Sequence, residues 1–455
     1  MSILILIAAF LFAIGVLVAV HEFGHYWVAK KLGFKVLRFS IGFGKPLLTR
    51  VGKDADRTEY CISAIPLGGY VKLLDEREGE VAAAELHRSF TRRPIIQRVA
   101  VLLAGPAMNL IFASLIYAVL AMVGTETVKP IVGQVRLDGP AAFAGMQRGD
   151  QILQVGERMV TDTEDLQIAM FKQVVSESAV FLRVRRGSGE KVLKLRVPDN
   201  ARSLTEPGKL LPGLGFDFAA WSAQVLVREV PPGSAGRAAG LAPGDRVIAV
   251  DGQSVANASE FKNMVSGAGG SRITLDVQRG SARRQVQADV PMVDDHGQKI
   301  GRLGIALQEG PRSWPPGLLE THRLGPIAAL REGIAKTYDM SVFTVSMLAR
   351  IVTGQVSAKN ISGPISIAEF AGVSALLGVS AFLGFLAIIS VSLGVLNLLP
   401  VPLLDGGQVV YQLVEAVKGT PLSERAQLFG QQLGIALLLV LMSLAFYNDI
   451  SRHLN

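Results

Sequence analysis

The sequence predicts a polytopic α-helical membrane protein with four spans, together with two small β-rich domains. Three observations lead to this fold class. Four apolar stretches are long enough to cross a bilayer, a polar central region contains an internal repeat, and hydrophobic residues make up 49% of the 455-residue chain. Because charged residues still make up 18% of the chain, we expect water-exposed domains beside the embedded helices.

The first apolar stretch covers residues 3–20 and contains no charged residue. A spanning helix needs about 20 apolar residues, so this stretch is predicted to cross the bilayer and to continue into the polar sequence that follows. A signal peptide is the weaker interpretation. The stretch has no basic N-terminal region, and His-Glu stands where a small-residue cleavage site would be.

Three further stretches are predicted to span the bilayer. The second covers residues 99–123, the third lies inside the charge-free segment 370–404, and the fourth lies within 426–448, most strongly at 433–447. Lys and Arg concentrate between the first two stretches. Because positively charged loops stay in the cytoplasm, residues 125–365 are predicted to lie on the opposite side, in the periplasm of a bacterial inner membrane.

The net charge of +8 and the single cysteine exclude some classes of protein. A basic chain can bind nucleic acid, but this charge has the distribution of a membrane topology, so no nucleic-acid partner is expected. Cys61 alone forms neither an intrachain disulfide nor a cysteine-rich zinc site.

An internal repeat divides the central region. The string GPAAFAGMQRGDQILQVGE begins at Gly139, and GSAGRAAGLAPGDRVIAVDGQ repeats its pattern with a shift of 95 residues. In each copy a Gly-Asp pair, with Asp150 or Asp245, precedes an alternating strand and a glycine turn. A long period that occurs twice indicates two tandem domains. The pattern resembles the PDZ family, which binds extended peptides by strand addition beside a loop of backbone amides.

The PDZ resemblance gives a division of the chain. We expect a membrane core with a cytoplasmic β-loop at 1–126, PDZ domains at 127–220 and 221–312, and an amphipathic linker helix with the last two spans at 313–455. Two loops are candidates for binding a terminal carboxylate. Their residues are Gly213, Leu214, Gly215 and Phe216 in the first domain, and Leu303, Gly304 and Ile305 in the second. Each loop follows its repeat core, which indicates a circularly permuted strand order.

The sequence HEFGH at the end of the first span matches the pattern HExxH. On a helix, His21 and His25 lie one turn apart on one face, so both imidazoles can bind one Zn²⁺. Glu22 lies about 100° around the helix, where it can take a proton from water and pass it to a leaving amine. The alternative is a set of ordinary polar residues at a membrane interface.

A catalytic zinc needs a third protein ligand and one open position. The first and third spans run in the same direction, so the third ligand should come from the cytoplasmic end of the third span. There the string NLLPVPLLDGGQ contains Asp405, the first ionisable residue after Glu369. Pro400 and Pro402 should interrupt the helix, and free backbone groups at membrane depth are tolerated only in a cavity or a protein interior.

Together these features resemble the site-2 protease family of intramembrane metalloproteases. The motif HExxH in the first span, N-x-x-P-x-P-x-x-D-G in the third and the PDZ pair between them cover essentially the whole chain. The resemblance implies a zinc metalloendopeptidase with one Zn²⁺ per chain. It assigns the zinc ligands His21, His25 and Asp405, the catalytic acid/base Glu22, and the substrate-binding residues Asn397, Pro400 and Pro402.

The cytoplasmic loop is predicted to contain membrane-associated β-hairpins, with strands near residues 42–50 and 61–76. A helical substrate must unwind before it is cut, and an edge strand holds an unwound segment by β-addition. The candidates for this strand are Gly69, Tyr70, Val71 and Lys72. Without the resemblance, a plain hairpin packed on the cytoplasmic face explains them equally well.

Three other patterns carry predictions. The string GPAMN at 105–109 should pack closely against the first span. An apolar stripe with Leu330, Ile334, Val342 and Val345 indicates a helix that lies on the outer leaflet or packs on a domain. The remaining histidines lack the spacing of metal ligands and are predicted to lie on the surface: His87, His296, His322 and His453.

The resemblance implies cleavage of single-span membrane proteins within the bilayer. The implied substrates are an anti-sigma factor already trimmed by another protease and remnant signal peptides, in envelope stress signalling. A membrane-anchored PDZ scaffold with an inactive protease core is the alternative. A zinc transporter is disfavoured by the single acidic residue of the third span and by the peptide-binding tandem.

Overall fold

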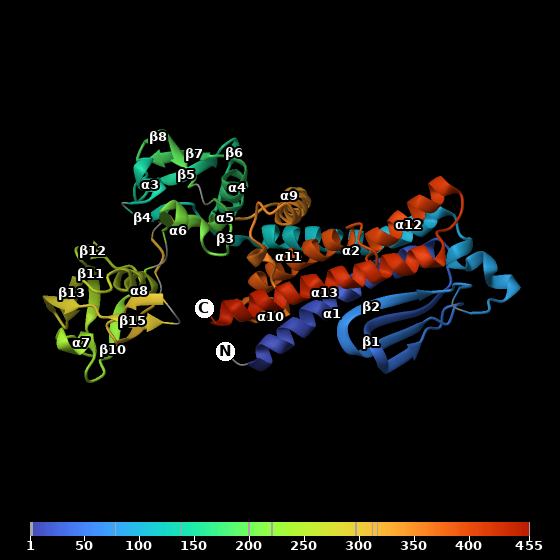
Figure 1. Cartoon of the computed structure of the whole chain (residues 1–455), viewed down its shortest axis with the longest axis horizontal. Helices are drawn as coiled ribbons and strands as arrows, with labels where there is room; N and C mark the ends of the chain where they lie inside the picture. The colour runs from blue at the N-terminus through green and yellow to red at the C-terminus, as the bar shows by residue number, and fades with distance from the viewer. Residues whose placement is uncertain are drawn as a thin grey trace. The chain divides into compact units, whose positions relative to one another are not determined.

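The computed structural model describes residues 3–454 except 78, 137, 199–200, 220–221, 296–297, 312 and 316. The chain forms two compact units. The helical unit contains Met1–Thr125 and His322–His453, and the β-rich unit contains Glu126–Thr321 with Leu454–Asn455. Figure 1 shows long helices in the first unit and short strands and helices in the second.

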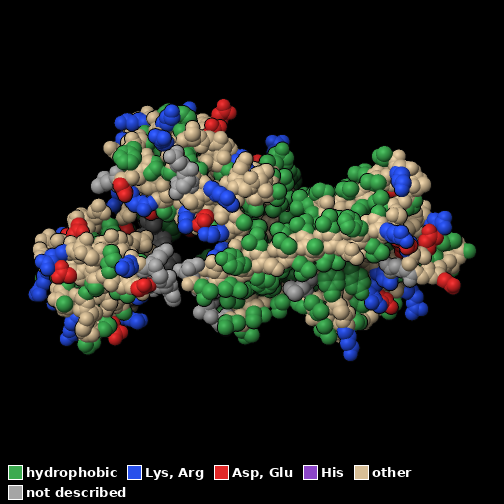
Figure 2. Space-filling model, in the orientation of Figure 1, with side chains coloured by type: hydrophobic (Ala, Val, Ile, Leu, Met, Phe, Trp, Pro, Cys, Tyr) green, Lys and Arg blue, Asp and Glu red, His purple; other side chains and the backbone are tan. Residues whose placement is uncertain are grey.

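Four helices of the described chain are long and apolar enough to cross a membrane. They are α1 (Ile3–Lys31), α2 (Ile95–Val123), α11 (Val379–Asn397) and α13 (Glu424–Leu454). Each falls on one of the four apolar stretches, so helix formation there is confirmed, whereas the number of membrane crossings stays a prediction. Apolar side chains cover much of the visible face of these helices, and charged ones gather near α12 (Figure 2).

Further helices complete the helical unit. They are α9 (Pro326–Val352), α10 (Pro364–Leu377) and α12 (Asp405–Lys418), with 3₁₀ turns η1 (Ala83–Arg88), η2 (Phe90–Arg92) and η3 (Ala358–Asn360). α2 packs against α1, α9, α11 and α12. The approach of α1 to α2 is close, because a Cβ on Gly24 would lie 2.3 Å from the carbonyl oxygen of Ala104. Small residues permit such backbone contact. The predicted close packing of 105–109 against α1 is confirmed, because Ala104 contacts Gly24 and Gly105 contacts His25.

α9 meets α2 through small residues rather than through its apolar stripe. Ala329, Gly333 and Thr337 are buried, and a Cβ on Gly333 would lie 2.2 Å from the carbonyl oxygen of Ser114. The stripe residues are exposed: Leu330, Ile334, Val342 and Val345. The stripe therefore leaves an apolar surface free on α9, as expected for a helix in contact with lipid.

A curled hairpin follows α1. β1 (Val36–Val51) pairs antiparallel with β2 (Glu59–Leu73), and Ser40 of β1 faces both Tyr70 and Cys61 of β2. The two ends of β2 therefore flank the first half of β1. Residues 69–73 pair with β1 on one side, and among the described residues no strand pairs on the other.

An ionic cluster ties the hairpin to the helix before it. Asp56 accepts a hydrogen bond from Lys30, at the C-terminal end of α1, and lies 2.7 Å from a guanidinium nitrogen of Arg88. Its side chain is only 5% exposed. This contact holds the turn between β1 and β2 against the end of α1, so it also fixes where β2 begins.

The β-rich unit contains two copies of one element order. The first copy is β4 (Val132–Val135), α3 (Pro140–Phe143), β5 (Gln151–Val155), β6 (Arg158–Met159), α4 (Thr163–Ser176), β7 (Ala179–Arg186), β8 (Gly189–Arg196), α5 (Ala201–Leu204), α6 (Leu210–Leu214) and β9 (Phe216–Phe218). Its sheets run β6-β5-β7-β8 and β4-β9, and its own hydrophobic core includes Ile152, Leu182 and Leu214.

The second copy repeats this order except that β15 and β16 stand where the first copy has α5 and α6, and its sheet is longer. It comprises β10 (Val225–Glu229), α7 (Ala235–Ala238), β11 (Arg246–Val250), β12 (Gln253–Ser254), α8 (Ala258–Gly267), β13 (Arg272–Arg279), β14 (Ala282–Asp289), β15 (Met292–Asp295), β16 (Gln298–Gly301) and β17 (Ala306–Glu309). Its strands run β14-β13-β11-β10-β17, around a core that includes Phe261 and Leu275. Outside the copies, β3 (Thr125–Val128) pairs with β18 (Leu319–His322).

The repeated Gly-Asp pair has the same structural role in both copies. Asp150 is fully buried and accepts hydrogen bonds of 2.7 Å from Arg186, at the end of β7. Asp245 accepts the same pair of bonds from Arg279, at the end of β13. Each carboxylate also accepts the backbone N–H three residues before it. The aspartate therefore joins the turn to the sheet in each domain.

Replacing Asp150 by Asn should destabilise the first copy in a pH-dependent way. Burial raises the pKa of Asp150, but bonds from Arg186 and the backbone N–H of Gln147 hold it below its usual range overall. Stability from a lowered pKa is present above the unfolded pKa of about 3.9 and is lost as the pH falls through the folded pKa. We expect a cost of about 2 kcal/mol at pH 7 and less at pH 3. Hydrogen-exchange protection of β5 in the intact protein measures it, and an equal cost at both pH values would contradict it.

Candidate metal centre

The third span ends at the predicted break. α11 stops at Asn397, a turn covers residues 398–404, and α12 begins at Asp405. A Cβ on Gly406 would lie 2.3 Å from the carbonyl oxygen of Leu398, and one on Gly407 would lie 2.2 Å from that of Val401. The two glycines therefore let α12 start directly against the turn, which points Asp405 into the bundle.

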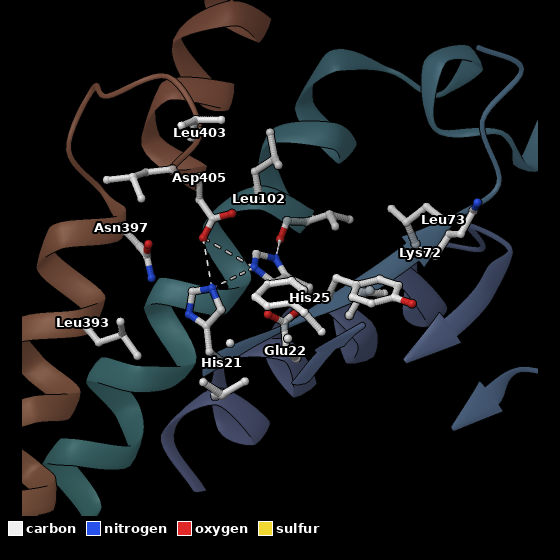
Figure 3. Close-up of a pocket in the computed structure, with 18 of the residues that line it drawn as sticks. His21, Glu22, His25, Lys72, Leu73, Leu102, Leu393, Asn397, Leu403 and Asp405 are labelled. Atoms are coloured by element: carbon white, nitrogen blue, oxygen red, sulfur yellow. Dashed lines mark hydrogen bonds and ion pairs between the residues drawn. The ribbon is translucent and has the colours of Figure 1, made fainter. Parts of the chain in front are cut away.

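Asp405 meets the two histidines of α1 (Figure 3). Its Oδ2 lies 3.1 Å from Nε2 of His21 and 3.5 Å from Nε2 of His25, and the two Nε2 atoms are 3.2 Å apart. All three atoms lie within 4.8 Å of one another, as the atoms that would ligate one metal ion do.

The tautomer of His25 is fixed by α2. Its Nδ1 lies 2.8 Å from the backbone carbonyl oxygen of Val101, which only accepts, so Nδ1 carries the proton and donates it. Nε2 then presents a lone pair toward Asp405. Gly105 makes room for the ring, because a Cβ there would lie 2.3 Å from Nε2 of His25.

His21 also has its orienting partner on α2. Nδ2 of the fully buried Asn109 lies 3.1 Å from Nδ1 of His21, whereas Oδ1 of Asn109 is buried without a partner. Amide oxygen and nitrogen positions are exchangeable by a 180° rotation. With Oδ1 toward Nδ1–H, both groups are satisfied and Nε2 of His21 presents a lone pair. Sequence reasoning assigned Asn109 to packing alone; its spacing of four residues from Gly105 places both on one face of α2.

The residues present fit a zinc ion. Oδ2 of Asp405 is buried and has no hydrogen-bond donor, although two imidazole nitrogens face it. Three converging lone pairs repel one another unless a cation lies between them. Two imidazoles and one carboxylate are also the donor set of several catalytic zinc sites, which keep a fourth position open. His21, His25 and Asp405 would therefore hold the metal.

Glu22 lies beside these three residues in one cavity of about 990 Å³. Its side chain contacts the hairpin closely, because a Cβ on Gly69 would lie 2.8 Å from Cγ of Glu22. The cavity also brings in other residues named from the sequence: Asn397 from α11, and Gly69, Tyr70, Val71 and Lys72 from β2. The ring of Phe43 stacks on that of Tyr70 at this wall.

The structure does not bring Pro400 and Pro402 to this cavity, since neither is among its described lining residues. They lie in the turn before α12, where the carbonyl oxygen of Pro402 would be 2.2 Å from a Cβ on Gly434 of α13. Their place in substrate binding therefore stays a prediction, and the structure gives them a role in shaping the turn.

The two candidate PDZ loops differ. Leu303, Gly304 and Ile305 line a cavity of about 730 Å³ between α8 and β17. In the first copy, Leu214 and Phe216 are buried in the core, Gly215 takes a φ of 86° at the end of α6, and Gly213 faces Leu204. The structure thus brings the second loop to a cavity and packs Leu214 and Phe216 of the first loop into the core.

The other histidines whose side chains the structure describes do not line the cavity. His87 and His322 are exposed, as predicted. His296 and the side chain of His453 lie outside the described residues.

Comparison with known proteins agrees with this geometry. The model of Peptidase family M50 matches residues 9–441, so the chain belongs to this family of site-2 zinc metalloproteases. The chain is also similar over its whole length to proteins named RseP, the regulator of sigma-E protease. The Protease RseP of Yersinia pestis is 39% identical over 459 residues, which is 99% of this chain and 100% of that protein. The Regulator of sigma-E protease RseP of Escherichia coli K12 is 38% identical over 449 residues, 98% of each chain.

Two further similarities complete the comparison. A candidate zinc metalloprotease of Neisseria meningitidis serogroup A is 39% identical over 447 residues, 98% of each chain. The crystal structure of the PDZ domain of an SdrC-like protein from Listeria monocytogenes matches 18% of this chain and 86% of its own length, at 22% identity and a TM-score of 0.17. A score this low carries no argument about the fold.

Asn109→Leu should weaken zinc binding, because it leaves the Nδ1 proton of His21 without an acceptor. Loss of such an orienting partner typically costs 10- to 100-fold in metal affinity, roughly the effect we expect here. Asn109→Asp keeps the acceptor and should bind zinc at least as tightly as the wild type. Competition with a chelator on purified protein measures both variants.

The control for this experiment is Ser390→Ala. Ser390 donates to the backbone carbonyl of Asn109, so its loss disturbs the same turn and leaves the amide in place. Wild-type affinity in Asn109→Leu would show that the amide does not orient His21.

Proposed function

We propose that the chain is a membrane-embedded zinc endopeptidase that cuts the transmembrane segments of single-span proteins. One observation carries this proposal: the lone pairs of His21, His25 and Asp405 converge within 4.8 Å, in a cavity whose other wall is a strand edge. The ligand set supports hydrolysis, and the strand edge supports a polypeptide substrate.

The strand edge accounts for the form of the substrate. Residues 69–73 of β2 are paired with β1 on one side and line the cavity on the other. A helical segment that unwinds beside this edge can add to the sheet as an extended strand, which exposes its carbonyl groups to the centre. Asn397, across the cavity, has an amide that can donate to one of these carbonyls.

The proton transfers fall to Glu22. When bound, one Zn²⁺ per chain would act as a Lewis acid that polarises the scissile carbonyl and acidifies water. The carboxylate of Glu22 would take the proton from the attacking water and return it to the amine that leaves. Its 8% exposure keeps bulk water away from this transfer.

We further propose a bacterial inner-membrane location, with the active site toward the cytoplasm. The basic loop between α1 and α2 supports this orientation. The two β-rich copies would be periplasmic PDZ domains at 127–220 and 221–312, between membrane parts at 1–126 and 313–455. Their element orders match apart from β15 and β16 in place of α5 and α6, which supports two domains of one kind.

The proposed substrates are a pre-trimmed anti-sigma factor and remnant signal peptides, within envelope stress signalling. The names of the relatives from Yersinia pestis and Escherichia coli support a role in sigma-E regulation. The alternative is a PDZ scaffold with an inactive core. The complete set of His21, Glu22, His25 and Asp405 in one cavity favours the enzyme.

Glu22→Gln should abolish cleavage and leave zinc bound. The amide cannot accept the proton, whereas the three metal ligands are unchanged. Cleavage of a tagged single-span substrate in detergent, with metal analysis of the same preparation, measures both effects. Loss of the metal, or turnover near that of the wild type, would remove Glu22 from its proposed role.

Deletion of residues 128–310 tests a role of the tandem as a size filter. We expect a flexible Gly/Ser linker in their place to permit cutting of a substrate that retains its bulky outer domain. Such a linker costs little entropy because the closure cost grows only logarithmically with length. A trimmed substrate, the control, should be cut with or without the tandem. If the deleted protein cuts only the trimmed substrate, the filter lies elsewhere.

A further inference from the structure

We propose that the ion pair between Arg98 and Glu415 positions Asp405 for metal binding. This inference rests on the metal centre described above and concerns residues that do not touch the metal. Arg98 lies in the first turns of α2, and Glu415 lies in the last turns of α12. Both act through Asp405, so both are positioning residues.

The pair has the geometry of a strong, directional contact. Nη2 of Arg98 lies 2.7 Å from Oε1 of Glu415, and Nη1 lies 3.1 Å from Oε2, so the guanidinium binds both carboxylate oxygens in parallel. The side chains are 7% and 17% exposed. A bidentate pair fixes both distance and orientation, and its loss in a buried place leaves a charge without a partner.

α12 transmits this constraint to the metal centre. Asp405 is the first residue of the helix, and Glu415 follows ten residues later, about 15 Å along the axis. At its start, α12 is held against the turn by Gly406 and Gly407, which fix the contact but not the tilt of the axis. The pair at Glu415 fixes the other end, and two fixed points define where the carboxylate of Asp405 lies.

α2, which carries Arg98, also contacts His25. Arg98, which binds α12, is three residues before Val101, whose carbonyl accepts from His25. Both contacts therefore arise within one turn of α2. A shift of α12 against α2 is thus a shift of Oδ2 of Asp405 against Nε2 of His25, which are 3.5 Å apart.

A double-mutant cycle tests the proposal. Four purified proteins are compared by chelator competition for zinc: the wild type, Arg98→Met, Asp405→Asn and the double variant. We expect Arg98→Met to weaken zinc binding about 10- to 100-fold in the wild-type background, as outer-shell changes do. In the Asp405→Asn background it should change affinity less than threefold, because the ligand it positions is already impaired.

Two rescue variants sharpen the readout. Arg98→Lys keeps the charge but not the bidentate geometry, so it should restore affinity only in part. The double variant Arg98→Glu with Glu415→Arg should bind zinc more tightly than either of its single variants, because it restores a pair of opposite charges. Additive losses in the cycle, or no loss in Arg98→Met, would overturn the proposal.

Two controls separate positioning from general stability. Leu120→Ala opens the core near the other end of α2 and should lower the melting temperature without weakening zinc binding. Arg92→Met removes a comparable but exposed pair with Glu76 and should change neither quantity appreciably. If Leu120→Ala weakens zinc binding as much as Arg98→Met does, the pair acts only through stability. If Asp405→Asn itself binds zinc like the wild type, the metal centre fails rather than this inference.

Discussion

The metal centre depends on one constraint: a single helix, α2, contacts both histidines and also the helix that carries Asp405. It accepts the proton of His25 at Val101, faces His21 with Asn109, and binds the helix of Asp405 through Arg98. Lone pairs that repel one another stay together only if their supports do not move independently. Because one rigid element carries all three supports, the ligands cannot drift apart without bending α2.

Close backbone contact makes this arrangement possible. Gly24, Gly105 and the pair at the start of α12 all lie where a Cβ would overlap a neighbouring atom. In a bilayer the hydrophobic effect does not press helices together, so small residues and polar contacts supply the packing. Gly24 lets α1 approach α2, the pair at the start of α12 lets Asp405 lie directly after the turn, and Gly105 clears the space that the ring of His25 occupies.

Much of the centre could be predicted from the chain. The spacing of His21 and His25 follows from helix periodicity, and Asp405 follows from the direction of the third span together with the proline break. Asn109 and Arg98 could not be assigned in this way, because their partners are 88 and 317 residues away. Their roles depend on which faces of α1, α2 and α12 meet, and periodicity alone does not determine that.

The edge of β2 at residues 69–73, where the described part of the chain places no further strand, has a consequence for the proposed cleavage. An edge strand binds the main chain, and every residue except proline offers it the same N–H and C=O groups. The proposed recognition at this edge would discriminate little between side chains. Discrimination then shifts to an earlier step, the free energy needed to melt a helix in the bilayer, where each unpaired backbone group is expensive. Under the proposed binding mode, selectivity would depend on how stable the substrate helix is in the bilayer more than on which side chains it carries.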